Sequence, residues 1–260
     1  DLIRFDAELD SRDGLGSGIE VSGTLPASLL LAKSASRQPE VAEPIVWDVR
    51  ATGADLDVAR WLRILANESV PLTSGRGEVE LQTSFSGLTP TALNLEVDLG
   101  PTVWQGVARA DNNYQRLELK AGWKATGGGW EATVGRFVVK RAGEISPAST
   151  GMIRYSRPAD GSSTLSASAD NLRLQNLWPV LWSVASTGLR RDFLPERLQG
   201  GVRNFKLTAS MPAGRAPTWV AEAAFEDLGL VMPAPGWAVT GFTGTVRADQ
   251  AGGRVKLDSG

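Results

Sequence analysis

Hydrophobic and polar residues alternate one for one through much of the chain. The pattern is clearest in six segments, which cover residues 3–9, 79–85, 93–99, 117–120, 205–211 and 219–226. Such alternation predicts β-strands with one face in water and one apolar face, as in antiparallel sheets. Glycine and Asp/Asn turn signals between the segments, at 111–113, 127–129, 160–161 and 252–253, indicate that the strands follow one another as a meander.

Apolar residues recur at helical spacing in only two places. One set follows Asp57 and comprises Val58, Trp61, Leu62 and Leu65; the other follows Asn176 and comprises Leu177, Trp178, Leu181, Trp182 and Ala185. An Asp or Asn side chain at this position accepts a hydrogen bond from the first free backbone N–H groups of a helix. The pattern therefore predicts two short amphipathic helices with Asp57 and Asn176 as N-caps.

The two predicted helices belong to a repeated pattern. Residues 51–58 and 167–174 share an Ala-x-x-Ala/Asp-x-Leu-x-Val/Leu order, and aligning Leu56 with Leu172 gives a spacing of 116 residues. A fixed period of this kind is typical of stacked modules. We expect strands in 1–50, a first strand–helix–meander module in 51–166 and a second in 167–260. The fold class predicted is mainly β: one long, curved antiparallel sheet forming an open groove or trough.

The composition excludes several kinds of catalytic and metal-binding chemistry and points to none. The chain of 260 residues has no Cys, no His and a net charge of -2. Thiolate and imidazole catalysis and the commonest transition-metal ligands are therefore excluded, and nothing electrostatic favours nucleic acid. We expect no catalytic residue, no metal site and no cofactor, and we predict that the protein is not an enzyme.

One carboxylate pair has the spacing of a catalytic site. Glu96 and Asp98 lie two apart on one strand face, roughly 7 Å from each other, which falls within the range used in glycoside hydrolysis. Glu78 and Glu80 have the same spacing, because alternation places such pairs on any solvated strand face. A solvated face explains the pair better than catalysis does.

No segment approaches the roughly 18 apolar residues of a membrane span, and no signal-peptide pattern stands at the N-terminus. Residue 1 already lies beside an amphipathic strand, which contains Ile3 and Phe5, and the last residues stop as abruptly. We expect the chain to be a segment of a longer protein.

The last quarter of the chain resembles the YhdP-type members of the AsmA-like family of bacterial envelope proteins, distant relatives of the bridge-like lipid-transfer proteins. The resemblance rests on an ordered series: Leu194-Pro195, Leu198-Gln-Gly200, Phe225-Glu-Asp-Leu-Gly-Leu230, Pro235-Gly236, Gly241-Phe-Thr-Gly244 and Gly253-Arg-Val-Lys-Leu-Asp-Ser259. The rest of the chain is similar only in its repeated amphipathic strands with inserted helices.

The resemblance implies a periplasmic trough, part of an inner-membrane-anchored protein of a Gram-negative bacterium. In this family the apolar concave face is thought to carry phospholipid acyl chains towards the outer membrane. The implied partners are acyl chains, neighbouring repeats of the same full-length protein and possible envelope proteins. We expect the family's anchor and both ends of the trough to lie outside this segment.

The predicted groove residues are the apolar members of the alternating strands: Ile3, Phe5, Val79, Leu81, Phe85, Leu93, Leu95, Val97, Leu117, Leu119, Phe205, Leu207, Trp219 and Phe225. Alternation alone favours a closed β-sandwich or barrel core, because most amphipathic sheets pack against one another, whereas the family resemblance favours an open or partly open groove. Two functions therefore remain open: conduction of lipid along an open groove, and a periplasmic scaffold or partner-binding module with a closed core and no lipid path.

Overall fold

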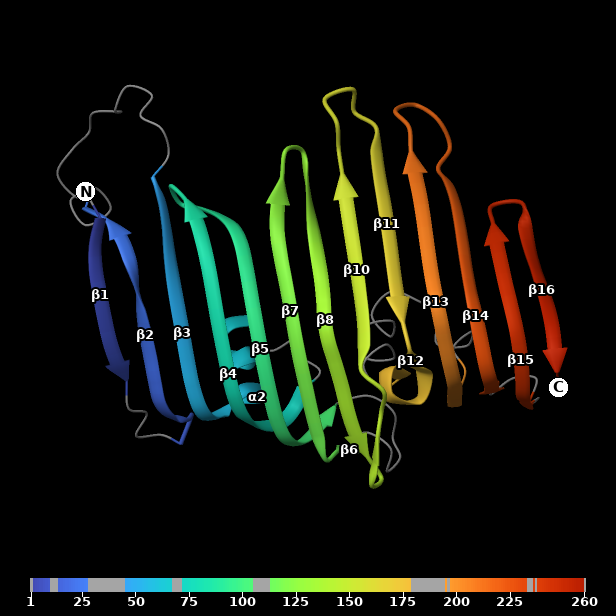
Figure 1. The fold of residues 1–260 in the computed structure, drawn as a ribbon, viewed down its shortest axis with the longest axis horizontal. Helices are drawn as coiled ribbons and strands as arrows, with labels where there is room; N and C mark the ends of the chain where they lie inside the picture. Colours follow the sequence, from blue (N-terminus) through green and yellow to red (C-terminus); the bar gives the residue numbers. More distant parts are fainter. Residues whose placement is uncertain are drawn as a thin grey trace.

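The chain forms one large open antiparallel sheet, seen in a computed structural model (Figure 1). The structure describes residues 2–9, 14–27, 45–66, 72–104, 113–178, 195, 197–232, 236 and 238–259. The sheet has 16 strands, and its main path runs β1-β2-β3-β4-β5-β7-β8-β10-β11-β13-β14-β15-β16. The short strands β6, β9 and β12 pair with β5, β8 and β13 beside this path. The expected mainly β, open sheet is confirmed.

Almost every strand pairs with its neighbours in sequence, as a meander requires. The bounds are β1 Leu2–Leu9, β2 Ser17–Pro26, β3 Val46–Asp57, β4 Leu72–Ser86, β5 Thr89–Trp104, β6 Asn113–Tyr114, β7 Arg116–Thr126, β8 Gly129–Arg141, β9 Glu144–Ile145, β10 Ser149–Ser156, β11 Ser163–Asp170, β12 Leu172–Arg173, β13 Arg197–Met211, β14 Thr218–Val231, β15 Ala238–Asp249 and β16 Gly252–Ser259. The sheet continues across positions 50/51 and 166/167, inside β3 and β11. The division into modules stays a prediction.

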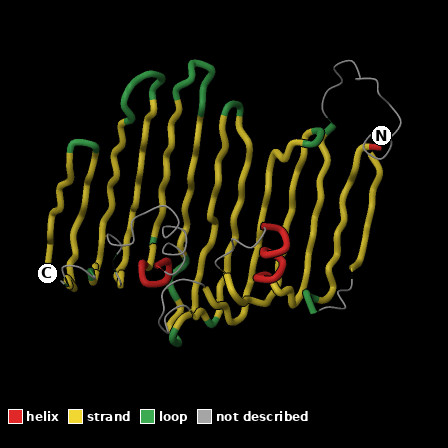
Figure 2. The backbone as a smooth tube through the Cα atoms, turned by 180° about the vertical axis from the view of Figure 1, so that it is seen from behind, coloured by secondary structure: helices red, strands yellow, loops and turns green. Residues whose placement is uncertain are grey.

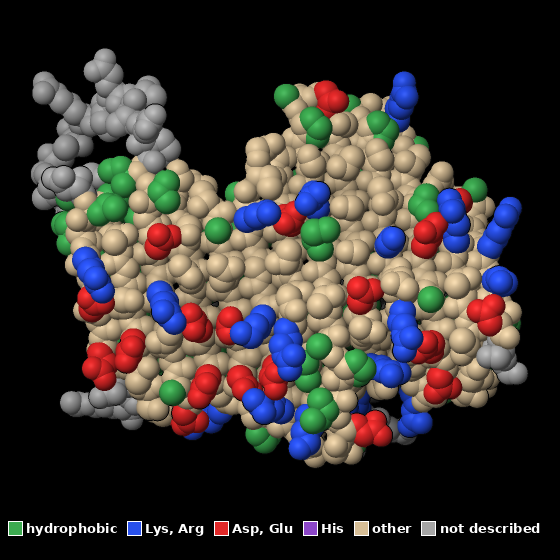
Figure 3. Space-filling view, viewed as in Figure 1, with side chains coloured by type: hydrophobic (Ala, Val, Ile, Leu, Met, Phe, Trp, Pro, Cys, Tyr) green, Lys and Arg blue, Asp and Glu red, His purple; other side chains and the backbone are tan. Residues whose placement is uncertain are grey.

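The two faces of the sheet differ in chemistry. Lys, Arg, Asp and Glu side chains are scattered over the face seen in Figure 3. Helix α2, Val58–Ala66, lies behind this face in Figure 1 and in front of the lower half of the sheet in Figure 2. We call the two sides the charged face and the apolar face. The margin at the top of Figure 1, formed by the hairpin turns, is the upper margin.

Helix α2 begins where the sequence predicts. The backbone N–H of Arg60 donates to Oδ1 of Asp57 at 3.0 Å, so Asp57 is the N-cap. Trp61 Nε1 donates to the Leu15 carbonyl at 3.1 Å, and Ala59 is fully buried. These contacts hold the helix against the lower part of the sheet, mainly over β4.

The N-cap predicted for the second helix is wrong. Helical residues begin at 174, directly after β12, so Asn176 lies inside the first turn. Its carbonyl accepts the Tyr114 hydroxyl at 2.5 Å, and the Gln175 carbonyl accepts from Arg141 Nη1 at 2.6 Å. The strand continues to Arg173 because β12 pairs with β13, which moves the helix start upstream. Leu181, Trp182 and Ala185 lie outside the described residues.

A backbone irregularity recurs with the period of the sequence repeat. Asp55 has φ 49° and Asn171 has φ 53°, and both stand immediately before a short strand end and a helix. Asp and Asn tolerate this left-handed conformation better than most residues. A register shift lies beside Asp55, between Gly53 and Leu56, and two others lie low on β4, between Leu72 and Ser74 and between Gly75 and Gly77. Such bulges bend strands, and the strands curve at their lower ends in Figure 1.

Few side chains are fully sequestered. The buried apolar residues of the described chain are Trp47, Ala59, Leu72, Leu99, Tyr114, Leu117, Val138, Val139 and Phe225. Most of them lie low on β4 to β8, beside the helices. Burial raises the pKa of Tyr114 above its ordinary range, although the Arg141 charge opposes the shift. The buried apolar residues of the described chain therefore lie mostly near the lower margin of the sheet.

Ion pairs between adjacent strands cross the charged face. Arg50 bonds Glu80 at 2.8 Å, between β3 and β4. Glu131 on β8 bonds Lys124 of β7 at 2.9 Å and also Arg154 of β10, so one buried carboxylate joins three strands. Hydrogen bonds from Lys124 and then Arg154 lower the pKa of Glu131. Because a one-residue slip would separate these partners, the pairs help to specify the register.

Replacing the helix cap tests the fold locally. Asp57→Ala should lower the free energy of unfolding by about 1 kcal/mol, because the Arg60 N–H loses its acceptor. Asp57→Asn keeps an acceptor and should stay close to the native value. Urea unfolding followed by circular dichroism measures both, and equal losses in the two variants would contradict the capping role.

The pH dependence of Glu131 follows from its lowered pKa. The carboxyl titrates at lower pH in the folded protein than in the unfolded chain, so it stabilises the fold above the ordinary glutamate pKa. That contribution is lost as the pH falls through the folded-state pKa. Glu131→Gln should therefore lower the urea midpoint at pH 7 and converge with the native chain in acid. Glu20→Gln, a carboxylate on the same face with no ion pair among the described residues, is the control; a gap that persists in acid would contradict the account.

Candidate functional site

One row of side chains crosses the apolar face from edge to edge without a charge. Each member is the direct register partner of the next, through all strands of the main path. The second half of the path continues in the same way. We call this the central row: Phe5, Gly23, Val49, Thr83, Leu93, Trp123, Ala132, Ile153, Ala167, Leu207, Ala221, Ala248 and Gly253. At roughly 4.8 Å per strand it extends about 58 Å.

A second uncharged row lies two residues further down each strand. It is the lower row, and its members are Ala7, Val21, Ala51, Leu81, Leu95, Ala121, Val134, Gly151, Ala169 and Phe205. After the register shift in β13, Ala223, Val246 and Val255 continue it towards the last edge. The two rows are about 7 Å apart, and together they form the apolar lane.

The apolar lane is poorly covered. Ile153 is 42% exposed, and Phe5, Leu93, Trp123 and Leu207 are only partly buried. Within the described ranges, only helix α2 and the helical turn at 174–178 lie on this face, and both stand at its lower half (Figure 2). The part of the chain that the structure describes thus leaves a long uncharged surface with no second layer over it.

The fourteen residues predicted for the groove share the apolar face. Alternation and register place Phe5, Leu93 and Leu207 in the central row, and Leu81, Leu95 and Phe205 in the lower row. Val79, Val97, Leu119, Leu117 and Phe225 stand below the lane, whereas Ile3, Phe85 and Trp219 stand above it. Leu117 and Phe225 are buried, so they belong to the core.

The sequence prediction missed several members of the lane. Trp123 continues the alternation of Leu117 and Leu119 on β7, and that pattern was sufficient to find it. Ile153 on β10 was hidden because Met152 beside it is also apolar, so periodicity does not say which side chain faces the lane. Ala132 and Val134 on β8 precede a register shift next to Val134, which interrupts the alternation along the strand.

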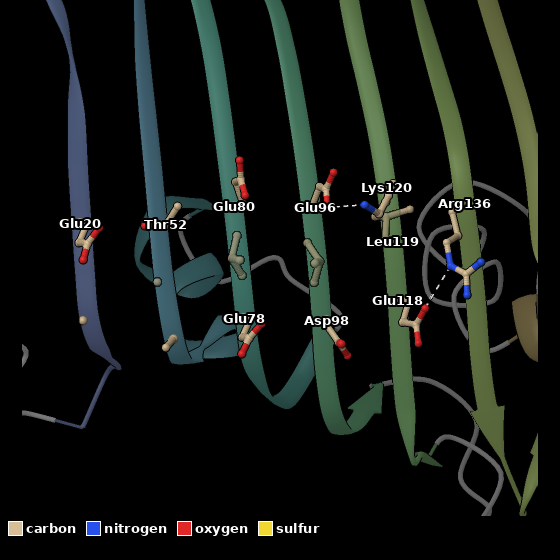
Figure 4. Close-up of a pocket in the computed structure, with 15 residues that line it drawn as sticks. Glu20, Thr52, Glu78, Glu80, Glu96, Asp98, Glu118, Leu119, Lys120 and Arg136 are labelled. Carbon is tan, nitrogen blue, oxygen red and sulfur yellow. Dashed lines mark hydrogen bonds and ion pairs between the residues drawn. The ribbon is translucent and has the colours of Figure 1, made fainter.

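The charged face carries a shallow depression bounded by carboxylates (Figure 4). Glu20, Glu80 and Glu96 share one row, with Glu78, Asp98 and Glu118 below it. Lys120 Nζ lies 2.6 Å from Glu96, and Arg136 Nε lies 3.1 Å from Glu118. These pairings make the surface one of exposed cross-strand ion pairs.

The environment of Asp98 does not suit a general acid. The Arg116 guanidinium donates two hydrogen bonds to Asp98, and the bond from Arg116 holds the pKa of that carboxyl below its usual value. Glycoside hydrolysis needs one carboxyl whose pKa is raised so that it can protonate the leaving group. The environment of Asp98 acts in the opposite direction, in agreement with the solvated-face interpretation.

No group of three or more His, Cys, Asp or Glu side chains among the described residues is arranged to hold a metal ion. No described helix is both long and apolar enough to cross a bilayer.

Comparison of the chain with protein-family models, with curated proteins and with solved structures gave no match. The resemblance to the AsmA-like family therefore stays a prediction. The fold and the surface described above are the observations from which a function is inferred.

Proposed function

We propose that this chain is a section of a hydrophobic groove that conducts phospholipid between the inner and outer membranes, without catalysing a reaction. The observation that carries the proposal is the central row, which passes through all strands of the main path with no charged side chain. The periplasmic location, the anchoring in a longer membrane protein and the neighbouring repeats are parts of the same proposal and rest on the sequence resemblance.

The energetics of acyl chains favour such a surface. Each methylene removed from water gains roughly 0.8 kcal/mol, whatever apolar group covers it. A lipid tail therefore needs continuity of apolar contact and few specific bonds. A uniform row also suits movement, because a tail displaced by one strand meets a similar surface. The central row provides such a surface across the whole sheet, from β1 at one edge to β16 at the other.

The alternative function is a periplasmic scaffold or partner-binding module with a closed core. It requires a second layer over the apolar lane, supplied by the chain or by a partner. The partial exposure of Leu93, Trp123 and Ile153 favours lipid conduction over a closed core.

A charge placed in the apolar lane tests the proposal. Leu95→Asp should lower the amount of phospholipid bound by about tenfold or more, because a tail crossing this position must bury an ionised carboxylate. The measurement is mass spectrometry of phospholipid extracted from the purified chain after incubation with vesicles.

Asn94→Asp is the matched control, because this substitution adds the same charge one residue away, on the charged face. It should bind as much lipid as the native chain. Circular dichroism verifies that both variants keep their strands. Equal lipid binding by both variants, or a native chain that extracts no phospholipid, would contradict conduction.

A further inference from the structure

Amphipathic aromatic residues gather in one row above the apolar lane. The register joins Ala125, Trp130, Tyr155, Leu165, Ala209 and Trp219 as successive partners from β7 to β14. Trp47 on β3 stands at the same level, with its ring stacked on Phe85 at 4.2 Å. We call these residues the upper row. Within the described residues, the central row holds Trp123 as its sole Trp or Tyr, and the lower row holds neither.

The register places the aromatic side chains of the upper row on the apolar face, over β8 to β14. Trp219 is 37% exposed, and the rings of Trp130 and Tyr155 lie 6.0 Å apart. No described residue bonds the Trp130 or Trp219 indole N–H or the Tyr155 hydroxyl. Trp and Tyr with an apolar body and a wet polar tip are favoured where hydrocarbon meets water.

Two arginines stand in the hairpin loops just above these rings. Arg157 follows β10, and Arg215 lies between β13 and β14. The two loops lie close together, since a Cβ added to Gly161 would lie 3.8 Å from the Ala213 Cβ. Neither arginine makes an ion pair with a described residue, whereas Lys124 and Arg154 are paired with Glu131. Asp160 stands in the same loop as Arg157 and accepts hydrogen bonds from Ser162, so this stretch of the upper margin carries two arginines and one carboxylate beside the aromatic residues.

We propose that this stretch of the upper margin holds the phosphate-bearing headgroup of a lipid whose tails lie on the apolar lane. Arg157 and Arg215 complement the phosphate charge, and Trp130, Tyr155 and Trp219 stand at the level of the glycerol. The inference rests on the proposed function and adds an orientation: headgroups at the upper margin, tails directed towards the helices. Charge complementarity above the lane and the position of the aromatic rings carry it.

Neutralising the two arginines separates headgroup recognition from tail binding. Arg157→Gln combined with Arg215→Gln should weaken binding of phosphatidylglycerol by about tenfold or more, the effect of losing charge-assisted hydrogen bonds. Binding of a diacylglycerol with the same acyl chains should not change. Arg254→Gln combined with Lys256→Gln removes the same charge from the charged face of β16 and should leave both affinities unchanged.

Crosslinking gives a second test that does not depend on the arginine variants. A photoreactive benzoylphenylalanine in place of Trp219 should label the glycerol or the first methylenes of phosphatidylglycerol. The same group in place of Leu207, one row lower, should label the tail. Mass spectrometry of the lipid adducts locates the bond.

The outcomes distinguish the two proposals. If the native chain binds neither lipid, the proposed function fails and the orientation fails with it. If both lipids bind but the arginine pair affects them equally or not at all, or if the two crosslinks label the lipid in the reverse order, conduction stands and the orientation is overturned. Competition by glycerol phosphate without tails would likewise overturn it, because it would indicate a site for a free anion.

Discussion

Among the described residues no second layer covers most of the apolar face, and the rest of the structure depends on this feature. A sheet normally buries its hydrophobic face against helices or another sheet, and that burial is the main favourable term in folding. Here the buried residues gather at the lower margin around Tyr114 and Val139, while Leu93 and Ile153 stay partly exposed. A large exposed apolar surface is typical of an interaction site. The acyl chains of the proposed function suit this surface because they need no specific polar contacts.

With little core, the sheet depends on contacts between adjacent strands. Backbone pairing is continuous from β1 to β16, and ion pairs such as Arg50–Glu80 and the Glu131 bridge reinforce it on the charged face. Exposed pairs contribute little individually. Their larger effect is on register, because the central row exists only if every strand keeps its alignment. The charged face thus helps to maintain the apolar face.

The sequence predicted the strands whose side chains alternate strictly, and it failed where alternation is broken. The segments around Leu95 and Leu207 were assigned to strands and to the apolar face without difficulty. β10 was obscure because Met152 and Ile153 are both apolar, and β11 because its inward residues include Ala167 and Ala169, which carry a weak hydrophobic signal. The cap predicted at Asp57 is confirmed, whereas the cap predicted at Asn176 is wrong, because the helix start is set by the pairing of β12 with β13, which joins residues 28 and 30 positions apart. Which residues share the central, lower and upper rows depends on the register of all the strands. No local pattern in the sequence determines that register.

A crystal structure of the chain grown with a phospholipid brominated along its acyl tails tests the central claim most directly. The account predicts anomalous bromine peaks in van der Waals contact with the central row, beside Leu93, Ile153 and Leu207. An apolar face filled by protein side chains, with no bromine along it, would contradict the account.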